Sequence, residues 1–405
     1  MKKKILWLKI GFIGIAFVSM LAVFSVYRLG DRMMLWSFVL FFMIYLVTVS
    51  SGNHLIFIKN KDIALFSGGW FVVYLMSIVF NSSIPDGTSW IYLFYVTMFL
   101  MLRRNIQWEI CVTFTKVLSV LLILGIVEFI IYQFTGIGIV LGYVERPENQ
   151  GYERFAHLIF SMVSERYDIV RFQSLANEPG LLGTLCGLLL FPTSNNKDLK
   201  IPFYTFLVAG VLTYSLAFYV LAVIFFLSRS VGKLHNLKYI ISIILVAAIV
   251  IYAVRDNVQE LIIDRLESGD ADNRSSLSMT FYFDKALAEG KLWLGIGAHN
   301  LPYEISGSNA GARVWIIQFG LVGLAIIMLT YIVTYYIRLG SKLQKNDIIF
   351  LIAFWLSFYQ RQTIIDSYTI LTFMMMPLVA SGYHMRQLKP KNNEKSPNIN
   401  YYPCI

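Results

Sequence analysis

The sequence predicts an all-α polytopic membrane protein with about 12 transmembrane helices, because of its composition and its long apolar runs. Of its 405 residues, 57% are hydrophobic and only 14% are charged, whereas soluble domains are about 45–50% apolar and about 25% charged. A helix needs about 20 apolar residues to cross a bilayer. These features exclude an ordinary soluble enzyme and a disordered chain. The net charge of +10 does not indicate nucleic-acid binding, because Lys and Arg in such a protein first report its orientation.

Ten apolar segments are expected to span the membrane. They are 5–27, 33–51, 63–80, 90–102, 117–135, 177–192, 239–254, 313–337, 348–360 and 369–385. The first is too long for a signal peptide and lacks a small-residue cleavage site, so we expect an uncleaved span. An eleventh stretch, 201–228, would be about 42 Å long as one helix, which requires strong tilt. The alternative is two short antiparallel spans, broken near Tyr214 and Ser215.

The distribution of positive charge favours the second alternative. Two crossings give 12 spans in one integral membrane domain, 1–405, with both termini and the tail 386–405 in the cytoplasm. Of the 34 Lys and Arg residues, 21 then lie inside, in short loops and tails where the positive-inside rule has force, and 13 lie outside. This topology leaves two large outward segments, 136–176 and 255–312. Apolar residues recur at helical spacing in both, so we expect short amphipathic helices there: Phe155, Leu158, Ile159 and Met162, and Val254, Val258, Leu261, Ile262 and Leu266.

The outward positive residues are mostly arginine. Eleven of the 13 are arginine, against five of the 21 inside, by count over the sequence. Arginine presents a planar, permanently charged fork that suits phosphate oxygens. For any single arginine, pairing with an outward acid such as Glu145 or Asp264 is the alternative. The set as a whole favours an anionic ligand at the outer face of the membrane.

The segment from Arg171 to Gly180 closes the first loop and leads into a span. We expect Asn177 to cap that helix and Pro179 to lie in its first turn. A helix N-terminus at the membrane interface is suited to bind an anion. If the segment is helical, Arg171 and Glu178 lie about two turns apart on one face. The alternative is a capped helix with a salt-bridged collar.

The second loop carries polar and glycine motifs that indicate a function less strongly than the segment from Arg171 to Gly180. Asp270 and Asp272 form a D-x-D, for which a solvated turn is the alternative to a metal site. Gly295 and Gly297 form a Gly-x-Gly without the strand-to-helix context of a nucleotide-binding loop, so we expect a tight turn. His299 is a candidate general base, or else a structural histidine. No zinc-ligand spacing exists, and the topology places none of the three cysteines in an outward loop.

One acid lies inside an expected span. Glu128 is surrounded in sequence by Leu, Ile, Val and Phe, and such a residue is a functional hypothesis by default. It is a candidate for a proton relay, for a structural hydrogen bond, or for a side chain that extends to the interface. At the outer end of the penultimate span, Arg361 follows Tyr359 and Gln360 and is a candidate phosphate ligand.

Four features in this order resemble the O-antigen and capsular polysaccharide polymerases (Wzy type), within the O-antigen ligase/polymerase superfamily. They are Arg171 followed by Asn177-Glu178-Pro179-Gly180, Ser215 in a turn between short spans, Asn273-Arg274 before Leu294-Gly295-Ile296-Gly297, and Gly320-Leu321-Val322-Gly323. The architecture of two outward loops and about 12 spans is similar over nearly the whole chain. Ligases of the superfamily carry a histidine-asparagine pair where this chain reads Ser308-Asn309-Ala310-Gly311, which favours a polymerase.

The resemblance implies a glycosyltransferase of the bacterial inner membrane. It would move a growing glycan from undecaprenyl diphosphate to the terminal sugar of another lipid-linked repeat unit, without a metal or other cofactor. Its candidate partners are membrane lipids, a chain-length regulator and a repeat-unit flippase. The expected base is Glu178 or else His299, and the expected diphosphate ligands are Arg171 and Arg274, then Arg313 and Arg361. The alternatives are an O-antigen ligase, and a lipid-linked oligosaccharide transporter, which predicts broken or charged helices and internal repeats.

Overall fold

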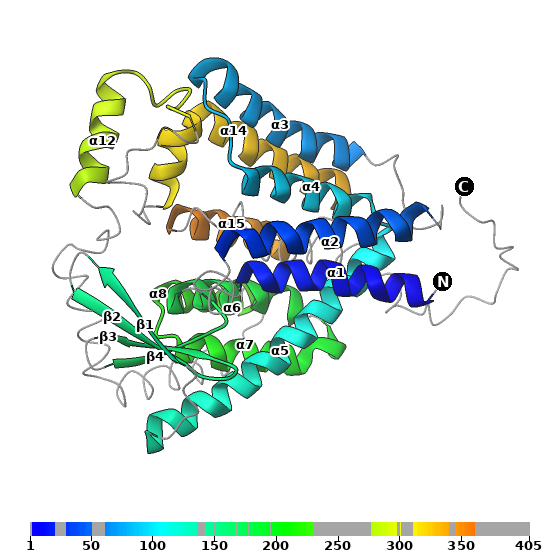
Figure 1. The fold of residues 1–405 in the computed structure, drawn as a ribbon, viewed down its shortest axis with the longest axis vertical. Coiled ribbons are helices and arrows are strands. Elements are labelled where there is room, and N and C mark those ends of the chain that lie inside the picture. The colour runs from blue at the N-terminus through cyan, green and yellow to red at the C-terminus, as the bar shows by residue number, and fades with distance from the viewer. Residues whose placement is uncertain are drawn as a thin grey trace, which may run out of the picture.

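A computed structural model describes most of the chain as a bundle of apolar helices (Figure 1). The described residues are 2–20, 30–50, 61–136, 142–148, 151–166, 169–176, 178–194, 196–230, 277–297, 300, 311–339 and 345–360. The helices are α1 (Lys2–Met20), α2 (Gly30–Ser50), α3 (Lys61–Asn81), α4 (Gly87–Met101), α5 (Arg104–Thr135), α6 (Pro179–Thr193), α7 (Lys200–Leu212), α8 (Leu216–Ser230), α12 (Leu277–Ala288), α14 (Gly311–Leu339) and α15 (Lys345–Gln360). A short 3₁₀ turn, Lys197–Leu199, precedes α7.

Within the described residues, three helical segments are long and apolar enough to cross a membrane: Ile63–Asn81, Arg104–Thr135 and Ala312–Leu339. Five shorter apolar helices accompany them: Leu6–Phe17, Leu35–Ser50, Ser89–Met101, Pro179–Thr193 and Leu216–Arg229. The mostly helical fold and the membrane class therefore agree with the prediction. The expected spans 239–254 and 369–385 lie outside the described residues, and the total of about 12 remains a prediction.

The stretch 201–228 is broken as its length suggested. α7 ends at Leu212 and α8 begins at Leu216. Between them Tyr214 has a positive φ of 48°, a conformation that few residues other than glycine adopt. The carbonyl of Ser215 accepts the amide of Tyr219 at 3.2 Å and so starts α8. This stretch is therefore two short helices and a turn.

The first loop is not helical, which corrects the prediction for 136–176. It forms a four-stranded antiparallel sheet in the order β1 (Gly142–Glu148), β2 (Gly151–His157), β3 (Met162–Arg166) and β4 (Ile169–Ser174). The helical spacing of Phe155, Leu158, Ile159 and Met162 was misleading, because those residues span the end of β2, the turn 158–161 and the start of β3. In β4 the alternation typical of a strand is present, and the buried Phe172 pairs with the buried Val163.

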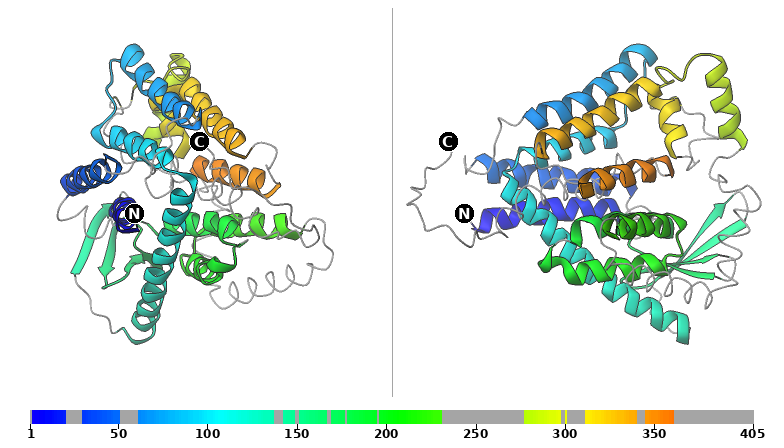
Figure 2. Two further views of the ribbon diagram at one scale, coloured as in Figure 1. Left: turned by 90° about the vertical axis from the view of Figure 1, so that its right-hand side faces the viewer. Right: turned by 180° about the vertical axis from the view of Figure 1, so that it is seen from behind.

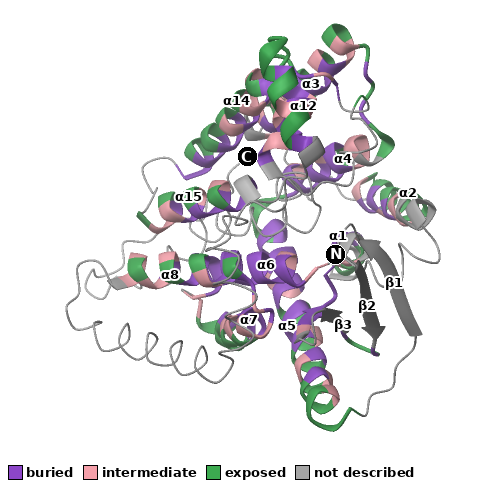
Figure 3. Ribbon diagram, turned by 90° about the vertical axis from the view of Figure 1, so that its left-hand side faces the viewer, coloured by how far each residue is buried: buried purple, intermediate pink, exposed green. Residues whose placement is uncertain are grey.

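The helices form neighbouring groups that share aromatic contacts. α3, α4 and α14 lie together in Figure 1, and Trp70 on α3 meets Trp315 on α14 edge-to-face, with ring centroids 6.1 Å apart. α6 packs between α7, α8 and α15 and is buried on nearly every side (Figure 3), as expected for a helix that is apolar all round. Phe191 of α6 contacts both Phe225 of α8 and Phe350 of α15. α5 runs obliquely across the other helices (Figure 2).

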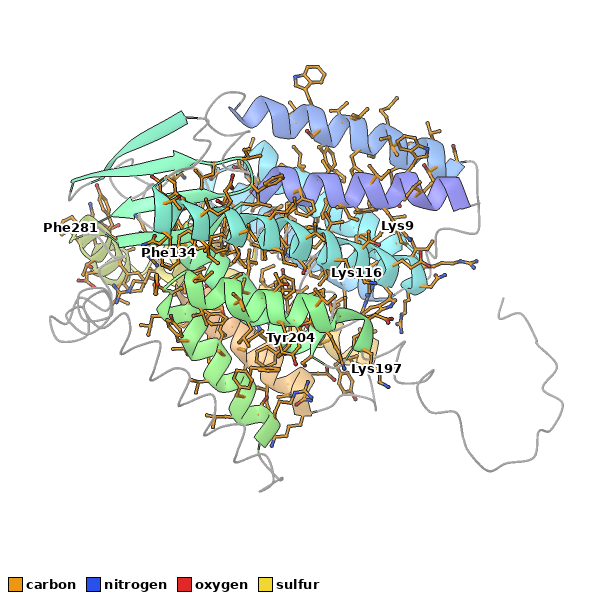
Figure 4. The ribbon with its side chains drawn as sticks, turned by 90° about the horizontal axis from the view of Figure 1, so that it is seen from below. Lys9, Lys116, Phe134, Lys197, Tyr204 and Phe281 are labelled. Carbon is orange, nitrogen blue, oxygen red and sulfur yellow. The ribbon has the colours of Figure 1, made fainter. Side chains whose placement is uncertain are left out.

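The sheet and α12 lie at one end of the bundle, and the N-terminal end of α1 lies at the other (Figure 1). Lys116 and Lys197, which are expected in cytoplasmic loops, lie away from the end that carries Phe281 of α12, and so does Lys9 of the first expected span (Figure 4). α12 is a helix in the second loop, but the amphipathic pattern predicted from Val254 to Leu266 lies outside the described residues. The two segments that were expected to face outward thus share one end of the molecule where they are described.

Arg338, which is expected at the cytoplasmic side, has a buried side chain. Arg338 lies in the last turn of α14 and donates from Nη1 to Oε1 of Gln107 on α5 at 3.0 Å. Gln107 in turn donates to the carbonyls of Phe99, Leu100 and Leu102 at the end of α4. This network joins three helices where α4 leaves backbone acceptors without helical donors.

Candidate functional site

Arg171 extends from β4 to the end of α7. Its Nε and Nη2 donate to the carbonyl of Thr213 at 3.1 and 3.0 Å, and Nη2 also donates to the carbonyl of Tyr214 at 3.3 Å. These carbonyls lie at a helix C-terminus, where a cation is stabilised by the helix dipole and by acceptors that lack helical donors. The guanidinium is half-buried. Arg171 therefore ties the sheet to the turn between α7 and α8, and its planar fork has a fixed orientation.

Glu178 begins α6, which corrects two predictions. Glu178, and not Asn177, is the N-cap residue, with extended backbone angles and a carbonyl that accepts the amides of Leu181 and Leu182. Arg171 lies on a strand, so Arg171 and Glu178 do not share a helical face. The predicted place of Pro179 in the first turn is confirmed. Asn177 itself lies outside the described residues.

A buried turn carries the chain from β4 into α6. The Gln173 side chain donates to the carbonyl of Ala176 at 2.8 Å, and the Ala176 amide donates back to the carbonyl of Gln173 at 3.1 Å. Gln173 is fully buried. Sequence reasoning missed this residue, although a glutamine between strand residues and a helix-start signal is a detectable pattern. The turn fixes where the α6 N-terminus begins.

The turn between α7 and α8 packs directly on α6. A Cβ on Gly183 would lie 2.5 Å from Cβ of Ser215, so only glycine allows this approach. Gly180 is buried in the first turn of α6, and its carbonyl accepts the Thr184 hydroxyl. Burial raises the pKa of the Tyr214 hydroxyl, which stays neutral at neutral pH. The segment from Arg171 to the start of α6 and the turn at Ser215 are thus brought together from two separate parts of the sequence.

Residues 292–297 and a break in α14 are joined by backbone hydrogen bonds, and we call this contact the backbone interlock. At Gly320, φ is 75° and ψ is 170°, so α14 is two helices joined by a kink. The amides of Ile296 and Gly297 donate to the carbonyls of residues 317 and 318 at 2.8 and 2.9 Å. The amides of Leu321 and Val322 donate to the carbonyls of residues 292 and 293 at 2.8 and 3.1 Å. The four backbone groups freed by the break are therefore satisfied by the chain itself.

The glycines of both motifs are needed for this contact. Gly295 and Gly297 have φ of 76° and 98°, which agrees with the predicted tight turn. A Cβ on Gly295 would overlap backbone atoms of α14, and a Cβ on Gly297 would overlap Ser83. The Asn300 side chain donates to the carbonyls of Asn81 and Ile296. The Gly295–Gly297 motif and the motif that begins at Gly320 thus form one structure through backbone hydrogen bonds.

The remaining predicted ligands are only partly described. Arg313, in the first turn of α14, lies over the ring of Phe283 on α12 at 5.7 Å from its centroid. Arg171 and Arg313 therefore contact different elements at the same end of the molecule. Arg274, His299 and Arg361 lie outside the described residues, as do Asp270 and Asp272. Among the residues that the structure describes, no group of three or more His, Cys, Asp or Glu could hold a metal ion.

Glu128 has a hydrogen-bonding role. Its carboxylate accepts the amide of Ile159 at 2.7 Å, the amide of Phe160 at 2.9 Å and the hydroxyl of Ser161 at 3.0 Å. These three donors form the turn between β2 and β3. Of the roles considered for this residue, the geometry favours the structural hydrogen bond, because the carboxylate holds the sheet on α5.

Comparison of the chain with family models, with curated proteins and with solved structures finds no match.

Proposed function

We propose that this chain is a polysaccharide polymerase of the bacterial inner membrane, with both termini in the cytoplasm and the sheet and α12 at the outer face. It would transfer a growing glycan from undecaprenyl diphosphate to the terminal sugar of another lipid-linked repeat unit. The observation that carries the proposal is the convergence of Arg171, Glu178 and the α6 N-terminus at the end of the bundle that holds both loop segments.

The chemistry suits this arrangement. Breaking the anomeric C–O bond leaves negative charge on a lipid diphosphate, which fixed cations and the positive end of the α6 dipole would stabilise without a metal. Arg171 and Arg274 are the proposed main ligands, with Arg313 and Arg361 assisting. Glu178 is the proposed base that accepts the proton of the sugar hydroxyl, with His299 as the second choice. Loss of one charged contact would raise the barrier by about 2–4 kcal/mol.

One observation, the break in α14 at Gly320, could support the transporter alternative. Discontinuous helices in transporters place free backbone groups at the substrate or ion site. Here the residues 292–297 already use the amides and carbonyls beside Gly320. The break therefore supports a fixed loop better than it supports an ion site, and we keep the polymerase as the proposal.

The test uses single alanine variants in cells that lack the native copy. Arg171→Ala and Glu178→Ala are compared with Arg104→Ala. Arg104 is an exposed arginine at the N-terminal end of α5 and is not part of the candidate site. After membrane expression is checked, surface glycan is separated on a gel. Single repeat units without the long ladder support the proposal. Loss of all surface glycan would indicate export or ligation instead, and an unchanged ladder in both site variants would contradict the site.

A further inference from the structure

The turn between β2 and β3 reaches down the side of α5. Glu128, which holds the turn, lies seven residues before the end of α5 at Thr135. At 1.5 Å per residue this is about 10 Å along the helix. A Cβ on Gly125 would lie 3.2 Å from the carbonyl oxygen of Phe160, so the turn is in close contact with the helix one turn further down. The turn therefore lies beside a segment that is long and apolar enough to cross a membrane.

The same part of α5 presents an exposed apolar stripe. Val127, Ile131 and Phe134 follow one another at spacings of three and four residues, and Phe134 is 84% exposed. The stripe continues down the helix through exposed positions at Val117, Val120 and Leu124. Glu128 follows Val127, about 100° further around the helix. The turn that it holds is therefore next to the stripe, and both face the same surroundings.

The turn itself is apolar and partly exposed. Ile159 is 44% exposed and Phe160 is 38% exposed, while Leu158 and Ser161 are buried. Most charged residues of the sheet lie toward the other ends of its strands, where the backbone register places Arg146 opposite Glu153 and Arg154 opposite Glu165. The described strand ends beside α5, which include His157 and Ser174, carry no Lys, Arg, Asp or Glu.

The hydrogen bonds of the turn fit a site without water. A tight turn leaves backbone amides without partners, and in water these are solvated, whereas in hydrocarbon each unsatisfied group costs several kcal/mol. Here both exposed residues, Ile159 and Phe160, donate their amides to the Glu128 carboxylate. An acid inside an apolar span is costly by itself, and three donors around it compensate for that cost.

We infer that the turn 158–161 inserts into the hydrocarbon of the bilayer leaflet nearest to the sheet, with the side chains of Ile159 and Phe160 among the lipid chains. The occupant of this surface is lipid, because the surface continues the exposed stripe of a candidate membrane span. Among its described residues, from Val117 to Phe134 on α5 and 158–161 in the turn, the only Lys, Arg, Asp or Glu is Glu128, which the turn covers. The sheet is then anchored in the membrane at one end and extends its charged end into water. This inference requires a membrane protein but does not depend on the polymerase activity.

The test measures the depth of a nitroxide label in the full-length protein. Phe160→Cys is labelled in a Cys404→Ser background, in which Cys111 and Cys186 remain as buried thiols. The protein is reconstituted in nanodiscs of phosphatidylcholine and phosphatidylglycerol, and collisions with oxygen and with a water-soluble nickel chelate are compared. Glu153→Cys, near the opposite end of β2, is the matched control, and Phe134→Cys marks the end of α5. Ile159→Cys replaces Phe160→Cys if that variant does not fold.

Insertion predicts that the label at 160 collides mainly with oxygen and lies at least as deep as the label at 134. The label at 153 should collide mainly with the nickel chelate. The inference is overturned if the label at 160 behaves like that at 153, because the turn would then be in water. It is also overturned if the label at 160 is shielded from both reagents, because a protein surface, such as a second copy, would then cover the turn.

Discussion

Replacing Gly320 by alanine should weaken the backbone interlock, which consists of the hydrogen bonds between α14 and residues 292–297. Gly320 has φ and ψ of 75° and 170°, a region that essentially only glycine occupies. Its missing Cβ also provides the space, because a Cβ there would overlap the carbonyl of Trp293 and backbone atoms of Leu294 and Gly295. Gly320→Ala must therefore strain the backbone and also push the two segments apart.

The expected cost follows from two terms. The unfavourable backbone conformation costs about 1–3 kcal/mol. The two hydrogen bonds nearest to the break, from Gly297 to Gln318 and from Leu321 to Leu292, contribute about 1 kcal/mol each. Together these terms predict that Gly320→Ala lowers the free energy of unfolding by about 3–5 kcal/mol.

The assay is equilibrium unfolding of the purified protein by sodium dodecyl sulfate in mixed micelles. The matched control is Gly68→Ala on α3, where a Cβ would meet nothing within 4 Å. That variant should be unchanged or more stable by about 0.5–1 kcal/mol, because alanine favours the helix. An unfolding midpoint for Gly320→Ala equal to that of the native chain would refute the proposed role of the kink.

Three further changes test other contacts. Glu128→Ala should release the β2–β3 turn from α5, so that its amides leave the hydrocarbon and exchange with water, at a cost of about 2–4 kcal/mol. Glu128→Gln keeps one acceptor oxygen and should have a smaller effect, so equal exchange in both variants would contradict this role. Gly183→Ala should lower the free energy of unfolding by about 1–3 kcal/mol, because its Cβ overlaps Ser215. An unchanged unfolding midpoint would mean that the turn between α7 and α8 can move away from α6. Arg338→Ala should lower the free energy of unfolding by about 1–3 kcal/mol, because the buried Gln107 oxygen loses this donor. The melting temperature should fall accordingly, and a native melting temperature would contradict the prediction.

The helical part of the fold could be predicted because apolar runs of suitable length leave few alternatives. Even the break at Tyr214 agrees with length, since the mainly apolar stretch 201–228 exceeds one ordinary crossing. The sheet could not be predicted from the pattern around Phe155, because four apolar residues across a turn imitate helical spacing. The alternation in β4, with Val170 and Phe172 separated by Arg171, was the better signal.

The candidate site shows a similar division. Pro179 correctly marked the first turn of α6, because a proline without a donor suits that position. The partners of Arg171 could not be predicted, since they are backbone carbonyls of Thr213 and Tyr214, and carbonyls leave no mark in the sequence. The pairing of Gly295 with Gly320 is hidden for the same reason. Chemistry carried by the backbone is visible only after the fold is known.

The pairing of α3 with α14 also sets the order in which the molecule can be built. Gly69 of α3 approaches Thr330 of α14 so closely that no side chain fits between them, yet α14 begins about 230 residues after α3 ends. At synthesis rates of about 5–20 residues per second, α3 waits on the order of 10–50 s for this neighbour. During that time α3 can pack on α4, through contacts such as the Ser67–Thr97 hydrogen bond, before the α14 residues that later contact it have been synthesised. A chain that stops before residue 311 would leave α3 without its main partner, and such fragments should be degraded faster than the full chain.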